Sequence, residues 1–177
     1  LDEVFQLMCR LNEAGIASET LGRLGGEGRS FREALEQSCA AIAEALGGAR
    51  LTYVELGPEP VKTSFILKTL LGLGVTIDRY IAVDINPKSS GPMKALLKNI
   101  LPKTALSFVT APFEEFRLSE TVAADAPPAV VTMLGFQEGN DDPFTVNGWL
   151  RDIARPGDLL LSESQLYTAG QVDRISG

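Results

Sequence analysis

Residues 51–63 read LTYVELGPEPVKT, and this stretch decides the fold. Its first six residues form a largely apolar run with high β-propensity, Gly57-Pro58 marks a turn, and a helical pattern begins at Val61. A buried strand that runs through a tight turn into a helix is the building unit of α/β proteins. The sequence therefore predicts an α/β fold around this strand.

The same alternation of apolar runs and helical patterns continues along the chain. Four further strands are predicted at residues 80–85, 105–110, 130–134 and 159–162, and helices at residues 61–71, 93–100 and 143–153. Because right-handed crossovers join parallel strands, few topologies are compatible with this order. We predict a doubly wound, mostly parallel sheet in the strand order 3-2-1-4-5, a Rossmann-like core.

Residues 1–48 are predicted to form an N-terminal helical segment that precedes the α/β core at residues 49–177. Ser30 and Glu33 form a capping box at the start of one helix. An amphipathic helix is predicted over residues 1–14, with an apolar stripe at Val4, Leu7, Met8 and Leu11. The core stops after its fifth strand, so we expect an open sheet edge that a homodimer or a further domain covers.

Composition excludes several classes of chemistry. The 177 residues include no histidine, which rules out histidine general bases, Ser-His-Asp triads and histidine-ligated zinc. Cys9 and Cys39 form neither a disulfide framework nor a metal pattern. A net charge of −7 disfavours nucleic acid and anionic membranes as partners. Since no apolar run is long enough to span a bilayer, we expect a cytoplasmic protein with a small-molecule substrate and no metal.

The turn after the first strand narrows the class of ligand. A dinucleotide site needs a G-x-G-x-x-G fingerprint, whereas Gly57 is followed here by Pro58, Glu59 and Pro60. Glu59 would also place a negative charge where a pyrophosphate binds. No Gly-Lys-Ser/Thr sequence closes the turn as in a P-loop. A nucleoside ligand without a pyrophosphate fits better, and S-adenosyl-L-methionine is such a ligand.

Four side chains are candidates to contact this cofactor. Asp84, at the end of the second strand, can accept hydrogen bonds from both ribose hydroxyls. Glu55 and the turn backbone can bind the ammonium group of the methionine tail, and Lys62 can bind its carboxylate. Phe113, after the third strand, can form one wall of an adenine slot.

Each candidate has a structural alternative. Asp84 could begin a turn with Asn86, and Glu55 could be a solvated residue at a strand end. Lys62 could be an ordinary residue of a first helical turn, and Phe113 could belong to the core.

Three segments resemble the class I S-adenosylmethionine-dependent methyltransferases. More narrowly, they are similar to the histidine-specific branch of the ergothioneine pathway. The resemblance covers about residues 51–163, and its segments are Glu55-Leu-Gly57 with Lys62-Thr63, Tyr80-Ile-Ala-Val-Asp84, and Leu134-Gly-Phe-Gln-Glu-Gly-Asn140.

The resemblance implies cofactor contacts at Gly57, Lys62, Asp84 and Phe113, and a substrate contact at Asn140. It implies direct methyl transfer to a small amine or another small-molecule nucleophile. It identifies no catalytic residue.

The chain also departs from the family pattern. Glu59 replaces a glycine of the turn, Pro112 stands where the family has an aspartate, and the last strands of the family fold are not found. These departures favour an alternative, a non-catalytic methyltransferase-like scaffold or interaction domain. A nicotinamide-dependent oxidoreductase is a third hypothesis, supported only by the βαβ pattern and Asp84.

Overall fold

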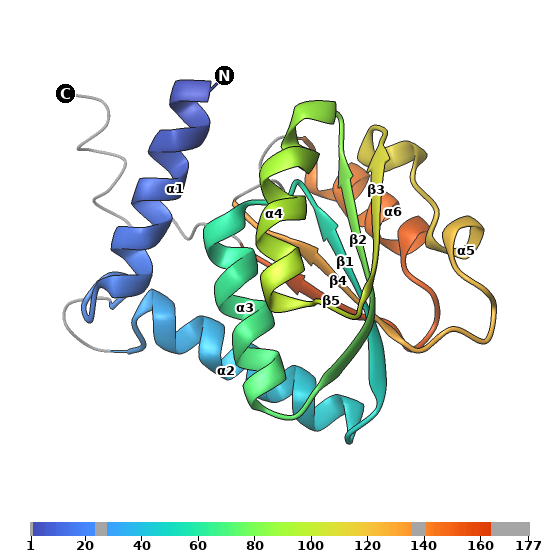
Figure 1. Ribbon diagram of the computed structural model, residues 1–177, viewed down its shortest axis with the longest axis horizontal. Helices are drawn as coiled ribbons and strands as arrows, with labels where there is room; N and C mark the ends of the chain where they lie inside the picture. Colours follow the sequence, from blue (N-terminus) through green and yellow to red (C-terminus); the bar gives the residue numbers. More distant parts are fainter. Residues whose placement is uncertain (1, 24–27, 136–140, 164–177) are drawn as a thin grey trace.

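A computed structural model of the chain describes residues 2–23, 28–135 and 141–163. Five parallel strands form one sheet in the order β3-β2-β1-β4-β5, which confirms the predicted fold class and strand order (Figure 1). The strands are β1 Arg50–Leu56, β2 Thr76–Asp84, β3 Ala105–Thr110, β4 Ala129–Met133 and β5 Leu159–Ser162. The helices are α1 Asp2–Ala17, α2 Phe31–Leu46, α3 Pro60–Gly72, α4 Ser90–Ile100, α5 Leu118–Thr121 and α6 Pro143–Ile153, with short 3₁₀ turns η1 Pro87–Ser89 and η2 Phe113–Glu115.

Helices cover both faces of the sheet. Helices α3 and α4 lie on one side of the sheet, and α5 and α6 lie on the other (Figure 1). Side chains of α2, α3 and α4 form one hydrophobic cluster with one face, and side chains of α5 and α6 form a second cluster with the other face. Successive side chains of β1 point to opposite faces of the sheet, so Tyr53 lies in the first cluster and Val54 in the second. All six residues from Leu51 to Leu56 are buried, as expected for a central strand of a parallel sheet.

Strand β2 begins at Thr76, earlier than the predicted start at residue 80, so this boundary was wrong. The residues at the amino end of the sheet include Asp78 and Arg79, which break the apolar run. Asp78 lies at the rim, where its Oδ1 accepts a hydrogen bond of 2.7 Å from Arg50 Nε. Polar residues at a strand end thus hid this part of the strand from a hydrophobicity pattern.

Helix α1 lies outside this layer, against α2 and α3 (Figure 1). It runs to Ala17, beyond the predicted end, and turns Cys9, Asn12 and Ile16 toward the protein. Its apolar stripe of Val4, Leu7, Met8 and Leu11 is exposed. None of the helices in the described ranges is both long and apolar enough to cross a membrane.

Two neighbouring leucines of α3 test the packing of the first cluster. Leu70 is 0 % exposed and Leu71 is 37 % exposed. We expect Leu70→Ala to lower the free energy of unfolding by about 2–5 kcal/mol, because it leaves a cavity in the core. Leu71→Ala, with the same change in helix propensity, should cost less than about 1 kcal/mol. Urea denaturation followed by circular dichroism measures both, and equal losses would contradict the packing described.

Candidate functional site

The candidate site lies at the carboxyl ends of β1 and β4. From β1 the chain proceeds to β2 on one side, and from β4 it proceeds to β5 on the other side. The following helices, α3 and α6, pack on opposite faces of the sheet. Loops leaving two such strands diverge, and open α/β sheets bind their ligands in the crevice that results.

Gly57 forms the turn that leaves β1. Its φ of 71° is in the left-handed region, which glycine adopts without the steric cost that a side chain brings. Its amide nitrogen donates a hydrogen bond of 2.9 Å to the carbonyl oxygen of Val83 in β2. The turn is therefore fixed beside the end of β2, where Asp84 lies.

Glu59 closes the amino end of helix α3. Its carboxylate accepts hydrogen bonds from the amides of Val61 at 2.8 Å and Lys62 at 3.0 Å. Asn12 of α1 donates a third, of 2.9 Å, to Glu59 Oε2. The positive end of this helix is thus bound by a carboxylate of the protein itself, which is only 8 % exposed. A phosphate at this place would meet a negative charge rather than unpaired amides.

Glu55 lies beneath the turn and links three elements. The Thr63 hydroxyl is 2.5 Å from Glu55 Oε1 and 2.6 Å from the carbonyl oxygen of Glu59. The Tyr80 hydroxyl donates to Glu55 Oε2. Since Thr63 has one hydroxyl hydrogen, it donates to only one of its two neighbours, and the carbonyl can only accept. A protonated Glu55 that donates to Thr63 satisfies all of these groups at once.

The environment of Glu55 favours this protonated form. Glu55 is 2 % exposed, and burial raises the pKa of its carboxyl from 4.5 to about 7. Hydrogen bonds that Thr63 and Tyr80 can donate to the ionised carboxylate act in the opposite direction. This burial excludes the alternative of a solvated strand-end residue. A contact between Glu55 and a cofactor ammonium stays a prediction, since the carboxyl is bound within the protein here.

Lys62 and Glu163 form a buried ion pair at the same edge. Lys62 is 2 % exposed, and its Nζ lies 2.7 Å from Glu163 Oε2, directly after β5. The same oxygen accepts a hydrogen bond of 2.8 Å from the amide of Gly135, which follows β4. Lys62 is therefore not an ordinary solvated residue of a first helical turn. Sequence reasoning missed Glu163, although an acid directly after a strand of a parallel sheet is a usable signal.

Asp84 is half-buried at the carboxyl end of β2. Its Oδ1 accepts a hydrogen bond of 2.8 Å from the amide of Asn86, so the predicted turn is present. Oδ2 takes no part in that bond. Phe113, in η2, is half-buried against the cluster under α6. Asn140, the predicted substrate contact, lies outside the described residues. Glu55, Gly57 and Asp84 thus lie at or near the ends of β1 and β2. The ammonium group of Lys62 lies on the other side of β1, beside the ends of β4 and β5, and Phe113 packs against the cluster under α6.

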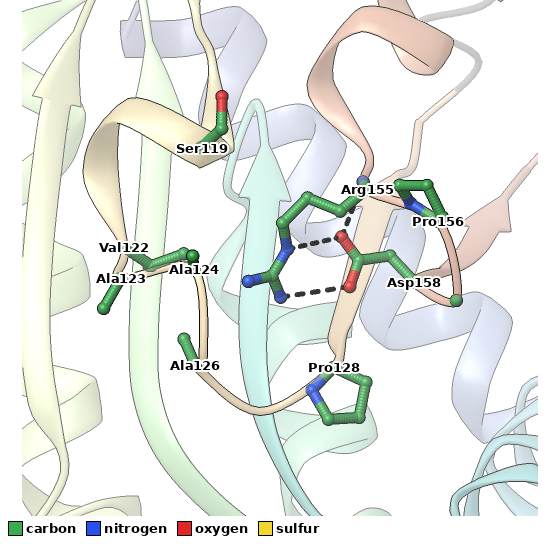
Figure 2. Close-up of a pocket in the computed structure, with 10 residues that line it drawn as sticks. Ser119, Val122, Ala123, Ala124, Ala126, Pro128, Arg155, Pro156 and Asp158 are labelled. Carbon is green, nitrogen blue, oxygen red and sulfur yellow. Dashed lines mark hydrogen bonds and ion pairs between the residues drawn. The ribbon is translucent and has the colours of Figure 1, made fainter.

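A hollow of about 530 Å³ opens at the opposite end of the sheet (Figure 2). Arg155 and Asp158 are paired in it, with Nη2 and Oδ1 3.1 Å apart. Asp158 Oδ1 also accepts from the amide of Ala129, and Arg155 Nη2 donates to the carbonyl oxygen of Pro127. These bonds tie the starts of β4 and β5 together, so we assign the pair a structural role.

The described part of the chain contains no group of acidic and cysteine side chains that could hold a metal ion. No protein-family model and no curated protein sequence matches the chain.

Several solved structures show a distant similarity to the chain. Cofactor-bound Rv0187 from MTB has 18% identity and a TM-score of 0.49, over 86% of this chain and 63% of that one. A COG1565 superfamily member and methyl transferase candidate from Burkholderia thailandensis, bound to S-adenosyl-homocysteine, has 18% identity and a TM-score of 0.39, over 70% of this chain and 35% of that one. EvdMO1 has 17% identity and a TM-score of 0.42, over 84% and 32%. The chain thus spans less than two thirds of the length of each of these proteins.

The protonation of Glu55 predicts a pH dependence of stability. Because its pKa is raised in the folded protein, its favourable contribution is complete below pH 4.5 and is lost as the pH rises through about 7. Glu55→Gln stays neutral, so wild type should lose on the order of 3 kcal/mol relative to this variant over that interval. Denaturant titrations at a series of pH values measure the difference.

Glu44→Gln is the matched control, because Glu44 is exposed on α2 and its side chain is solvated in the folded and unfolded protein alike. A wild-type profile parallel to that of Glu55→Gln across pH 4.5 to 7 would show that folding does not raise the pKa of Glu55.

Proposed function

We propose that this chain is the cofactor-binding part of an S-adenosylmethionine-dependent methyltransferase that acts on a small amine or another small-molecule nucleophile. One observation carries the proposal. The amino end of α3 is occupied by the Glu59 carboxylate, while Asp84 stands at the end of the adjoining strand with one oxygen outside its turn hydrogen bond. The site therefore suits a nucleoside and disfavours a phosphate.

The ribose and the adenine account for two of the contacts. Asp84 is acidic, half-buried and next to the turn at Gly57, so its carboxylate can accept hydrogen bonds from vicinal hydroxyls. Phe113 offers an aromatic surface to a flat purine. The same reasoning opposes the nicotinamide dinucleotides, because their pyrophosphate would lie against Glu59.

The amino-acid tail of the cofactor accounts for the others. Lys62 lies in the first turn of α3, directly after the turn at Gly57, and its ammonium group can pair with the carboxylate of the tail. The backbone around Gly57 can accept a hydrogen bond from the ammonium group. Glu55 holds the turn in place through Thr63 and Tyr80, which links β1, β2 and α3.

When bound, the cofactor supplies an activated methyl group. The contribution of this chain would be to orient the donor and to keep water away from it, with Asn140 positioning the nucleophile. Histidine and related amino-acid amines are the first substrates to test, since the sequence resembles the histidine-specific branch.

A non-catalytic scaffold is the second candidate. The observation in its favour is that the charged groups of the site already have partners within the protein. Glu59 accepts hydrogen bonds from Asn12 and from the amide of Lys62, and the ammonium group of Lys62 pairs with Glu163. A scaffold would keep these bonds permanently and would bind no cofactor.

Isothermal titration with S-adenosylmethionine and S-adenosylhomocysteine tests the proposal. We expect micromolar binding by the wild-type chain, and a loss of about 10- to 100-fold in Asp84→Ala, because hydrogen bonds to a carboxylate are lost. Asp78→Ala is the matched control, since Asp78 lies at the other end of the same strand in a surface ion pair. Absence of heat with either ligand, from a folded sample, would support the scaffold instead.

A further inference from the structure

The Lys62–Glu163 pair is a buried ion pair at the end of the sheet where the candidate site lies. Lys62 and Glu163 side chains are 3% and 16% exposed, and the pair lies between the carboxyl ends of β1, β4 and β5. Isolating two charges from water costs about as much as their attraction returns, so apolar residues could tie these strands together equally well. Unlike the Arg155–Asp158 pair at the amino ends of the strands, this pair lies at their carboxyl ends, where open α/β sheets bind ligands, which makes it a candidate for a role besides stability.

The two partners differ in how they are held. Glu163 Oε2 accepts from both Lys62 Nζ and the amide of Gly135, and Oε1 takes part in neither bond. Gly135 has a φ of 78°, and a Cβ added to it would lie 3.6 Å from Lys62 Nζ. The positive φ favours glycine at this position, whereas 3.6 Å is an ordinary van der Waals separation. The amide of Gly135 can hold Glu163 in place while Lys62 changes partner.

We infer that the Lys62–Glu163 pair is the binding site for the zwitterionic end of the cofactor, an α-ammonium carboxylate. In this exchange the ligand carboxylate takes the place of Glu163 at Lys62, and the ligand ammonium takes the place of Lys62 at Glu163. The inference rests on the proposed function and assigns Glu163 to it.

The need of every buried charge for a partner of opposite charge determines which ligands such a site accepts. The exchange replaces one ion pair by two, so no buried charge is left without a partner. A tail that carries only an ammonium group would leave Lys62 unpaired, and a tail that carries neither charge would leave the original pair intact. The site therefore selects a complete α-amino acid end and not merely one of its charges.

Titration of two ligands against paired variants tests this inference. S-adenosylhomocysteine has the zwitterionic tail, and 5′-methylthioadenosine has the same nucleoside without it. We expect Lys62→Met/Glu163→Gln, which removes both charges, to weaken binding of S-adenosylhomocysteine by about 10- to 100-fold. Binding of 5′-methylthioadenosine should change by less than about 3-fold, because this ligand does not open the pair.

A second arm uses the wild-type protein alone and so does not depend on the folding of a variant. The decarboxylated form of S-adenosylhomocysteine keeps the ammonium group and lacks the carboxylate. It should bind about 10- to 100-fold more weakly than S-adenosylhomocysteine itself, and no more tightly than 5′-methylthioadenosine.

The outcomes separate the two proposals. If neither S-adenosylhomocysteine nor 5′-methylthioadenosine binds the wild-type chain, the proposed function fails and the inference fails with it. If both bind, but the double variant weakens both equally or neither, the function stands and the inference is wrong. Equal affinity of the wild-type protein for the intact and decarboxylated ligands would also overturn it.

Discussion

The structure depends on one constraint: β1 is buried on both faces, so an ionisable group that it carries is costly unless it finds a partner inside the protein. Glu55 is the residue for which this matters most. Its carboxyl is bound by Thr63 of α3 and Tyr80 of β2, and Thr63 in turn contacts the carbonyl of Glu59. A single buried carboxyl thus fixes the first turn of α3 relative to two strands. The geometry of the turn at Gly57 follows from that arrangement.

The same region shows how a loop can favour one class of ligand over another without a clash. Glu59 uses its carboxylate as a helix cap and thereby occupies the position where a phosphate would be stabilised. Asn12 donates a hydrogen bond to the same carboxylate, so helix α1 takes part in this preference although Asn12 is 47 residues from Glu59 in sequence. The bond to Asn12 makes the N-terminal segment part of the candidate site.

The fold could be predicted because its signals are local. Apolar runs, helical periodicity and turn residues all act within a few positions, and they located the strands along the chain. The rule for crossovers between parallel strands then limited their order in the sheet. The first residues of β2 were not predicted as strand, because they are polar residues at the rim of the sheet and interrupt the apolar run. Glu163 and Asn12, which bind Lys62 and Glu59, were not predicted for a different reason. Glu163 is 101 residues from Lys62, and Asn12 is 47 residues from Glu59. No local pattern records such pairings, whereas Asp84 and Gly57 lie at strand ends that the pattern does locate.

The sequence distance between Lys62 and Glu163 has a consequence for synthesis of the chain. Translation begins at the amino end, so Lys62, β1 and α3 leave the ribosome long before Glu163 does. Until β5 has emerged and docked beside β4, the ammonium group of Lys62 has no carboxylate partner at position 163. The candidate site is therefore among the last parts of the described chain to be completed. A nascent chain that stalls before this point holds most of the sheet but lacks the acidic half of the ion pair.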